Sequence, residues 1–200
     1  FHQKLDIPVI FITAYAESEL LERAKRSEPF GYIVKPYSNK ELRATIETAL
    51  DKARKEKQLR ESENRYRTLA ESSPSTVEVI QNGRFVYINP AGVRMFGFER
   101  PQQILGMPML DVVAPEYRFK AAERLGETEK GRSNPPGEFE LIRRDGSRIL
   151  VESVSAPTLY QNRPATLIIG HDITNRKRAE TLLAETQKGL SAAQAHLREL

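Results

Sequence analysis

The sequence predicts two folded parts of different class, an incomplete doubly wound α/β part followed by an α+β domain, joined and followed by long helices. The apolar run at residues 7–14 is typical of a strand buried on both faces of a parallel sheet. Alternating residues around Asn82-Gly83 predict an antiparallel hairpin, the start of a five-stranded antiparallel sheet with helices on one face. Charged stretches without proline at residues 51–72 and 175–200 predict the long helices.

The composition is that of an ordinary globular protein. Apolar residues make up 39% and charged residues 29% of the 200 residues, which supplies enough Leu, Ile, Val and Phe to build cores and excludes disorder throughout. The net charge of +4 is small beside the 31 basic and 27 acidic residues that produce it. Because acidic and basic residues interleave along most of the chain, we expect no nucleic-acid partner.

The sequence also lacks features that several functions need. It has no cysteine, so disulfides, thiolate metal sites, cysteine nucleophiles and a cysteinyl-flavin photocycle are excluded. No apolar run approaches the roughly 20 residues that cross a bilayer, and the first residues lack the order of a signal peptide. We therefore expect a cytoplasmic protein without a membrane partner.

The first part consists of two strand-helix pairs. The strand at residues 7–14 and a second apolar strand at residues 32–34 are expected to lie in one parallel sheet, and Lys35-Pro36 ends the second strand. Ser38 or Asn39 can cap the helix that follows. Two buried strands cannot complete a doubly wound sheet, so we expect the rest of that domain to precede this chain. The predicted helices of this part are residues 18–26 and 39–50.

Two long helices are predicted outside the folded parts. Residues 51–72 are rich in helix formers and form a connecting helix, whose second half has a stripe able to meet a partner helix. In residues 175–200 a stripe with alternating spacings of four and three predicts a parallel coiled coil, weakened by its Ala and Thr members. The alternative is one amphipathic helix folded back on its own domain. The stripes are Leu59, Ser62, Tyr66, Leu69 and Ser73, and Ala179, Leu183, Thr186, Leu190, Ala193, Leu197 and Leu200.

The second part contains five predicted strands. Asn82-Gly83 tolerates the positive φ angles of a tight turn between the first two strands, within residues 76–88. Asn89-Pro90 then opens a short helix, and Pro115 lies in the first turn of a longer helix that runs to about Glu129. The last three strands are residues 138–143, 148–159 and 165–172, joined at Asp145-Gly146 and at Gln161-Asn162.

Two phrases of the first part carry a resemblance to a known family. IPVIFITAYAE at residues 7–17 and GYIVKP at residues 31–36, with the helix after them, resemble the C-terminal part of response-regulator receiver domains. The resemblance implies that Thr13 hydrogen-bonds the phosphoryl group of a phosphoaspartate, that Lys35 pairs with it, and that the rotamer of Tyr32 follows Thr13. It also implies a cis peptide bond before Pro36.

These three residues form only half of a receiver site. In the family, the phosphoacceptor Asp and the acidic pair that holds Mg²⁺ lie on the first and third strands, which this chain does not contain. One cation and one hydroxyl can organise the charge of an acyl phosphate, but we expect this chain neither to accept phosphate nor to bind Mg²⁺ usefully. The simpler alternative is that Thr13 and Lys35 are a strand-end hydroxyl and a surface amine.

Three phrases of the second part resemble PAS domains, in order and over residues 63–175. They are FVYINPAGVRMFGF at residues 85–98, FELIRRDGSRILVESVSAP at residues 139–157, and IIGHDITNRKRAE at residues 168–180. The resemblance implies a pocket between sheet and helices that holds a haem, a flavin, a small organic ligand or only side chains. The domains are then a truncated receiver (1–50), a helical linker (51–73), a PAS sensory domain (74–174) and a coiled-coil signalling helix (175–200).

We expect neither haem nor flavin in this pocket. The usual haem arrangement needs an axial His on the long helix, and residues 115–131 contain none. The three histidines, His2, His171 and His196, show no metal-ligand spacing, and we expect His171 to face solvent. An unknown small ligand remains open, and the alternative is that the candidate residues simply pack the core. These candidates are Val79, Phe85, Phe96, Phe98, Ile104, Met107, Met109, Val113, Phe119 and Phe139.

The phrase Asp172-Ile173-Thr174 marks the exit from the sheet into the last helix. Thr174 or Asp172 can cap that helix, so a distortion of the sheet would change the angle at which the helix leaves. An ordinary helix cap is the simpler reading. The sequence thus predicts a mechanical route from the pocket to the C-terminal helix.

The function predicted is a sensory and dimerisation module of a two-component protein, relaying a PAS-sensed or phosphorylation signal to an output such as a histidine kinase. We expect a homodimer through PAS and helices, with two-component proteins upstream or downstream. We expect no catalysis by this chain, because it has no nucleophile with an adjacent base and no phosphate-binding loop. The alternatives are the same module ahead of a diguanylate cyclase or another output enzyme, or a PAS-mediated transcription regulator.

Overall fold

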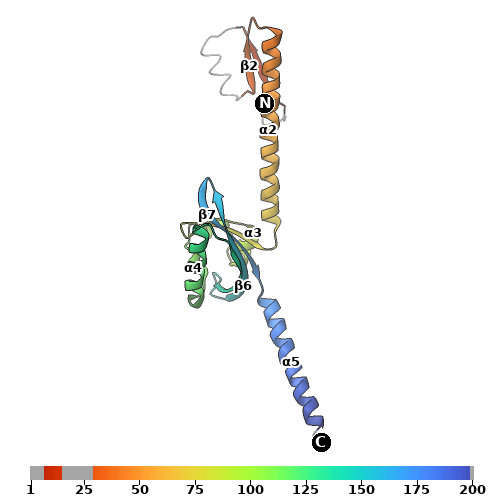
Figure 1. The fold of residues 1–200 in the computed structure, drawn as a ribbon, viewed down its shortest axis with the longest axis vertical. Helices are drawn as coiled ribbons and strands as arrows, with labels where there is room; N and C mark the ends of the chain where they lie inside the picture. Colours follow the sequence, from red (N-terminus) through yellow and green to blue (C-terminus); the bar gives the residue numbers. More distant parts are fainter. Residues whose placement is uncertain (1–6, 15–28, 199–200) are drawn as a thin grey trace. The chain divides into compact units, whose positions relative to one another are not determined.

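The computed structural model describes residues 7–14 and 29–198. Its contacts divide the chain into two compact units, Phe1–Thr68 and Leu69–Leu200. The division falls within one long helix, α2, which belongs in part to each unit (Figure 1). Each unit has a sheet of its own.

Two parallel strands form the sheet of the first unit. β1 (Ile10–Thr13) pairs with β2 (Gly31–Val34), which confirms the two predicted strands and their parallel pairing. The Lys35 backbone N–H donates to the Thr13 carbonyl oxygen at 2.8 Å, and the Lys35-Pro36 peptide bond is cis, as expected. The helix predicted at residues 18–26 lies outside the described residues.

Helix α2 (Asn39–Ser72) begins with a reciprocal cap. The Ser38 hydroxyl oxygen accepts from the Glu41 N–H at 3.2 Å, and the Glu41 carboxylate accepts from the Ser38 N–H at 2.7 Å. The Ser38 hydroxyl also donates to this carboxylate at 2.9 Å, and the two bonds that Ser38 donates hold the pKa of Glu41 below its usual value. The helices predicted at residues 39–50 and 51–72 are one continuous element of 34 residues.

The second unit contains the predicted five-stranded antiparallel sheet. Its strand order is β4-β3-β7-β6-β5, so the last two strands of the chain reach the centre of the sheet. The strands are β3 (Thr76–Gln81), β4 (Arg84–Ile88), β5 (Asn134–Ile142), β6 (Arg148–Tyr160) and β7 (Arg163–Asp172).

Two tight turns close the hairpins of this sheet with positive φ angles. Asn82 and Gly83, at φ 50° and 71°, connect β3 to β4, as predicted from this dipeptide. Gln161 and Asn162, at φ 50° and 58°, connect β6 to β7 in the same conformation without a glycine. Both turns therefore match the right-handed twist of the strands they join.

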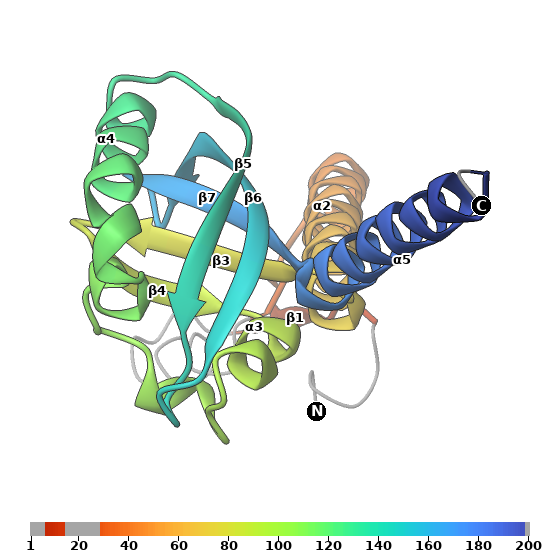
Figure 2. The same ribbon diagram turned by 90° about the horizontal axis from the view of Figure 1, so that it is seen from below.

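Helices cover one face of the sheet, with α4 packed across β5, β6 and β7 (Figure 2). The Asn89 side chain accepts from the Gly92 N–H at 2.9 Å, which caps α3 and satisfies one of its unpaired N–H groups. The core between the two layers is built on large, fully buried side chains such as Phe85, Phe96 and Ile104. The helices are α3 (Pro90–Met95), α4 (Arg118–Glu129) and the short 3-10 helices η1 (Pro101–Gln103), η2 (Met109–Val112) and η3 (Pro115–Tyr117).

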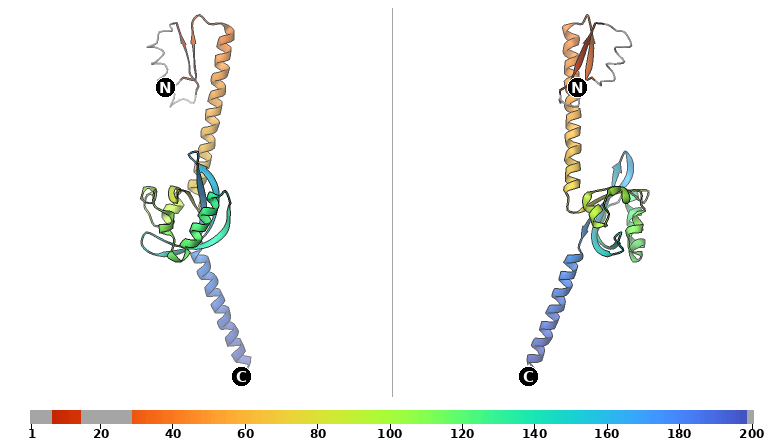
Figure 3. Two further views of the ribbon diagram at one scale, coloured as in Figure 1. Left: turned by 60° about the vertical axis from the view of Figure 1, so that its left-hand side comes forward. Right: turned by 180° about the vertical axis from the view of Figure 1, so that it is seen from behind.

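Helix α5 (Thr174–Arg198) follows directly from β7 as one unbroken helix (Figure 3). Leu182, Leu183 and Leu190 on this helix are each at least 60% exposed. In the part of the chain that the structure describes, no helix is both long enough and apolar enough to cross a membrane.

Candidate functional site

A cavity of about 60 Å³ lies between the sheet and the helices of the second unit. Its apolar wall is built on Phe85 and Phe96, whose rings meet edge to face with centroids 5.9 Å apart. Phe139 on β5 and Val151 on β6 continue this wall. Five of the ten pocket candidates contact the cavity: Phe85, Phe96, Met109, Val113 and Phe139.

The prediction that Phe119 lines the pocket is wrong. Phe119 lies on α4 with its side chain 83% exposed, while Ala121, Arg124 and Leu125 line the cavity. These three residues are spaced three and four apart, so they share the inner face of the helix, and Phe119 falls outside it. An apolar residue type was therefore a poor guide to the inner face of α4.

The other four candidates are buried or half-buried away from the cavity. Val79 follows Glu78, which lines the cavity, and successive strand residues point to opposite faces of the sheet. The same alternation returns Ile80 to the core. Ile104 belongs to the core, and Phe98 and Met107 pack against it without reaching the cavity. All four predictions of a pocket-lining role are corrected.

The polar lining of the cavity was missed in the sequence analysis. Glu78 on β3 and Arg124 on α4 both line it, and Ser153, Ser155 and Thr166 add hydroxyl groups from β6 and β7. Side chains of the strand at residues 76–81 point alternately to the two faces of the sheet, and Glu78 shares a face with Thr76. This alternation could have indicated that Glu78 faces the cavity. No comparable local signal marked Arg124.

Glu78 is a carboxyl group inside the fold. Its residue is 5% exposed, and loss of water raises the pKa of its carboxyl from 4.5 to about 7. A hydrogen bond from the Thr76 hydroxyl acts in the opposite direction on this pKa but does not offset the burial. The Thr76 oxygen also accepts from the Gly170 N–H at 3.1 Å, which links Glu78 to β7.

Arg124 is held by backbone oxygens of β5 and β6, two of the strands that α4 covers. Its Nη2 donates to the Pro135 carbonyl at 2.7 Å and to the Ser153 carbonyl at 3.1 Å. Its guanidinium also lies 5.3 Å from the centroid of the Phe139 ring. Partial burial lowers the pKa of this guanidinium, which still leaves it charged at neutral pH.

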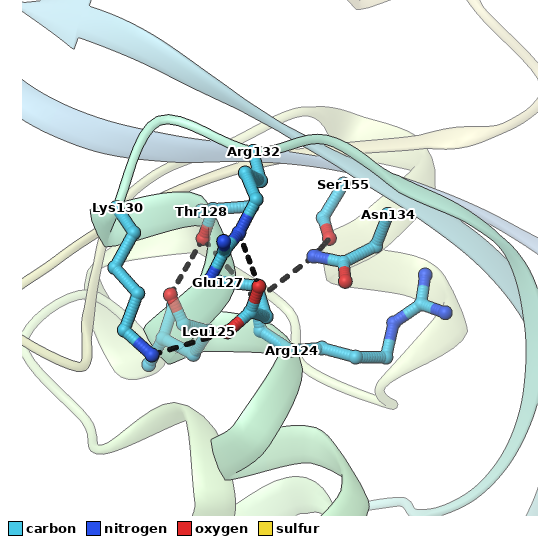
Figure 4. A network of polar contacts seen from close by, with 8 residues as sticks. All are labelled: Arg124, Leu125, Glu127, Thr128, Lys130, Arg132, Asn134 and Ser155. Atoms are coloured by element: carbon cyan, nitrogen blue, oxygen red, sulfur yellow. Dashed lines mark hydrogen bonds and ion pairs between the residues drawn. The ribbon is translucent and has the colours of Figure 1, made fainter.

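A network of polar contacts fixes the C-terminal end of α4 next to the cavity (Figure 4). The Asn134 amide donates to the Arg124 carbonyl at 2.9 Å and to the Ser155 hydroxyl at 3.0 Å, joining the helix to β6. Thr128 donates to the Leu125 carbonyl at 2.7 Å and lies 2.6 Å from the Thr166 hydroxyl. Glu127 pairs with Lys130 and Arg132 on the outer side of the same turn.

The predicted exit phrase forms the junction between β7 and α5. Asp172 Oδ1 accepts from the Thr174 N–H at 2.9 Å, so Asp172 supplies the bond to the first turn. The Thr174 hydroxyl accepts instead from the Leu150 N–H of β6 at 3.0 Å, so of the two predicted caps it is Asp172 that bonds to the helix. Ile173 between them is 1% exposed and anchors the junction in the core.

Ion pairs connect the start of α5 to the sheet. Lys177 Nζ lies 2.7 Å from a Glu138 carboxylate oxygen, and this pair raises the pKa of Lys177. Arg176 lies 3.6 Å from Glu152 on β6. Arg143 Nη2 lies 3.3 Å from Asp172. Strands β5, β6 and β7 are therefore all tied to the first turns of the helix or to the residues that cap it.

The three residues predicted for a receiver half-site lie on the first sheet or just after it. A backbone hydrogen bond joins Lys35 to Thr13 at the carboxyl ends of β1 and β2, while Tyr32 is 49% exposed on β2. His171 is exposed, as expected, with its Nδ1 3.3 Å from the Ser75 hydroxyl. Among the side chains that the structure describes, in residues 7–14 and 29–190, His, Asp and Glu form no cluster that could hold a metal ion.

The fold and cavity define a sensory-type α+β domain, and a sequence profile of the PAS domain matches residues 73–175, just over half of the chain. The chain belongs to the PAS-domain family. The similarity to solved structures agrees with this. The PAS domain of an HTR-like protein from Haloarcula marismortui is 24% identical with a TM-score of 0.52 over 60% of this chain and 98% of its own. A PAS domain from Colwellia psychrerythraea is 19% identical with a TM-score of 0.50 over 56% of this chain and 97% of its own.

Among curated proteins, Sporulation kinase A of Bacillus subtilis (strain 168) is 29% identical to this chain over 123 residues. The match covers 62% of this chain and 20% of that kinase. The chain thus spans about a fifth of the length of this relative.

Proposed function

We propose that this chain is the sensory and relay module of a two-component signalling protein, in which the state of the cavity sets the geometry of α5. The observation that carries the proposal is the position of β7. Its residues Ile168 and Gly170 line the cavity, and Asp172, two residues further on, holds the first turn of α5. A displacement of β7 at the cavity therefore acts on the helix through the short stretch of strand from Ile168 to Asp172.

A homodimer is part of this proposal. Leu183 and Leu190 lie seven residues apart on α5 and are 60% and 61% exposed, as the stripe of a parallel coiled coil requires. We infer that a second copy of α5 covers them. The similarity to Sporulation kinase A supports a histidine kinase as the output that this helix addresses.

Cysteine cross-linking tests the relay, because the natural chain has no cysteine. Leu183→Cys is expected to form a disulfide between two copies under mild oxidation, and Lys188→Cys, off the stripe on the same helix, is the matched control. Adding Asp172→Ala to Leu183→Cys should change the cross-linking yield, because it removes the bond that holds the first turn. Equal yields for Leu183→Cys and Lys188→Cys would refute the parallel pairing.

We further propose that the first unit is the C-terminal part of a receiver domain. The parallel β1-β2 pair, and the backbone hydrogen bond that brings Lys35 next to Thr13 at the ends of these strands, support this. The chain itself would then be unable to form a phosphoaspartate, since the acidic residues of a receiver site lie on other strands. Incubation with labelled acetyl phosphate and Mg²⁺ should leave it unlabelled, and stable labelling of an aspartate in this chain would contradict the assignment.

A further inference from the structure

We propose that the cavity of the second unit binds a small zwitterion with the groups of an α-amino acid, its ammonium facing Glu78 and its carboxylate facing Arg124. The inference rests on the proposed sensory function and gives its ligand a chemical class. It depends on two opposite charges that line one cavity, each without an ionic partner in the part of the chain that the structure describes.

Glu78 supplies the acidic end of the site. Among the described residues no cation pairs with its carboxyl, and the one polar side chain that acts on its pKa is Thr76. A buried carboxylate without a cation is costly, so the protein gains when a ligand brings a positive, hydrogen-bond-donating group. A primary ammonium meets both requirements with three N–H donors.

Arg124 supplies the basic end. A guanidinium has five N–H donors, and Nη2 uses its two on the Pro135 and Ser153 carbonyls. No carboxylate among the described residues pairs with this guanidinium, which leaves its charge to a ligand. Gly137 gives it room, since a Cβ at that position would come 2.7 Å from Arg124 Nη1. Arginine is well suited to a ligand carboxylate, because the two groups form parallel hydrogen bonds.

The sheet register places the two ends close enough for one small molecule. Glu78 lies opposite Ile168, and Ile168 lies opposite Ser155, in one row across the sheet. The neighbouring row, Thr76, Gly170 and Ser153, carries the carbonyl that holds Arg124. Glu78 and Ser153 are therefore two strand spacings and two residues of strand apart, roughly 12 Å between backbones, and the side chains of Glu78 and Arg124 both line the cavity.

Gly170 keeps the middle of that interval open. It lines the cavity between the two charged ends, and a Cβ there would come 2.7 Å from Thr76 Oγ1 and 3.1 Å from Val151 Cγ1. The hydroxyl groups of Ser153 and Ser155 lie on the same side of the sheet and can complete the hydrogen bonds of a polar ligand. The absence of a side chain at Gly170 thus permits a ligand to bridge Glu78 and Arg124.

The size of the cavity limits the ligand to a few heavy atoms. Its volume is about 60 Å³. Pockets for drug-sized ligands occupy roughly 300 Å³ or more. A cavity of roughly 150 Å³ accepts benzene. Glycine is the smallest α-amino acid and therefore the natural probe. On the benzene scale its five heavy atoms already need the cavity to widen, and larger amino acids would need it to widen further.

Calorimetric titration of the whole chain with three matched probes tests the inference. Glycine carries both charged groups, methylamine only the ammonium and acetate only the carboxylate. We expect saturable binding of glycine and at least tenfold weaker binding of the other two. Absence of glycine binding, or equal binding of glycine and either single-group probe, would overturn the proposal, and this comparison needs no variant.

Variants test whether Glu78 and Arg124 form the acidic and basic ends of the site. Glu78→Gln and Arg124→Gln should each weaken glycine binding at least tenfold, whereas Phe119→Ala, at an exposed position on α4, should leave it unchanged. Circular dichroism checks that each variant is folded, and Arg124→Lys replaces Arg124→Gln if the latter unfolds. If folded Glu78→Gln binds glycine as tightly as the natural chain, the assignment is wrong.

The cross-linking experiment keeps this inference separate from the proposed relay. Cross-linking at Leu183→Cys without glycine binding would refute the proposed amino-acid ligand and leave the proposed relay standing. Glycine binding without cross-linking would refute the pairing of α5 and leave the proposed ligand standing.

Discussion

The strands of the two units differ in how far their apolar side chains are buried. In the second unit, Ile80 on β3 and Val151 on β6 are 1% and 2% exposed, because helices cover the sheet. In the first unit, Phe11 and Ile12 on β1 are 39% and 47% exposed, and Val34 on β2 is 39% exposed. Since buried apolar area is the main source of stability, the second unit should hold most of the folding free energy of this chain.

The largest expected effect comes from removing the centre of the core of the second unit. Phe96→Ala deletes a ring that is 1% exposed and packs on Phe85, which should cost about 3 to 5 kcal/mol. Phe119→Ala on the same unit, at an 83% exposed position, should stay within about 0.5 kcal/mol of the natural chain. Urea denaturation followed by circular dichroism measures both.

Hydrogen exchange with mass spectrometry then sharpens the comparison of the two units. Phe96→Ala should speed exchange in β3, β6 and β7 and leave the first turns of α2 unchanged, because the two units have separate contacts. Equal acceleration in both units would show that they unfold together.

The second prediction concerns the acidic group buried in the second unit. Below pH 4.5 Glu78 is protonated in the folded and unfolded states and has no effect on stability. Between pH 4.5 and about 7 the unfolded state ionises first, so stability falls as pH rises, and the loss is complete above pH 7. Glu78→Gln removes this loss, which is at most about 3 kcal/mol.

Urea midpoints of the natural chain and Glu78→Gln at pH 5, 6, 7 and 8 test this. The difference between the two should shift in favour of Glu78→Gln as pH rises. Glu129→Gln, an exposed carboxyl change on α4, is the control and should run parallel to the natural chain. Parallel profiles for Glu78→Gln as well would show that its carboxyl is not buried as the structure has it.

Local patterns predicted most of the fold of the second unit. The Asn82-Gly83 turn, the Asn89 cap and the five strands depend on residues close in sequence, so the sequence alone was sufficient for them. The cavity lining depends on contacts between distant segments. Arg124 faces the cavity because carbonyls of β5 and β6 hold it, and the buried Val79 lies on the opposite face of β3 from Glu78. Contacts with distant carbonyls leave no hydrophobic pattern in the sequence.

The smallest expected effect is in the first unit, where the cap at Ser38 can be tested against a matched hydroxyl. Ser38→Ala removes the acceptor for the Glu41 N–H, which should cost about 1 kcal/mol of local helix stability. Thr48→Ala removes a hydroxyl that donates to the Ala44 carbonyl within the same helix and frees no N–H, so it should have little effect. Hydrogen exchange in the first turn of α2 should accelerate about fivefold for Ser38→Ala alone. Because the described strands of this unit leave many apolar side chains exposed, such a cap should matter more here than a single cap does in the second unit. An unchanged first turn would show that contacts outside the cap hold the helix start.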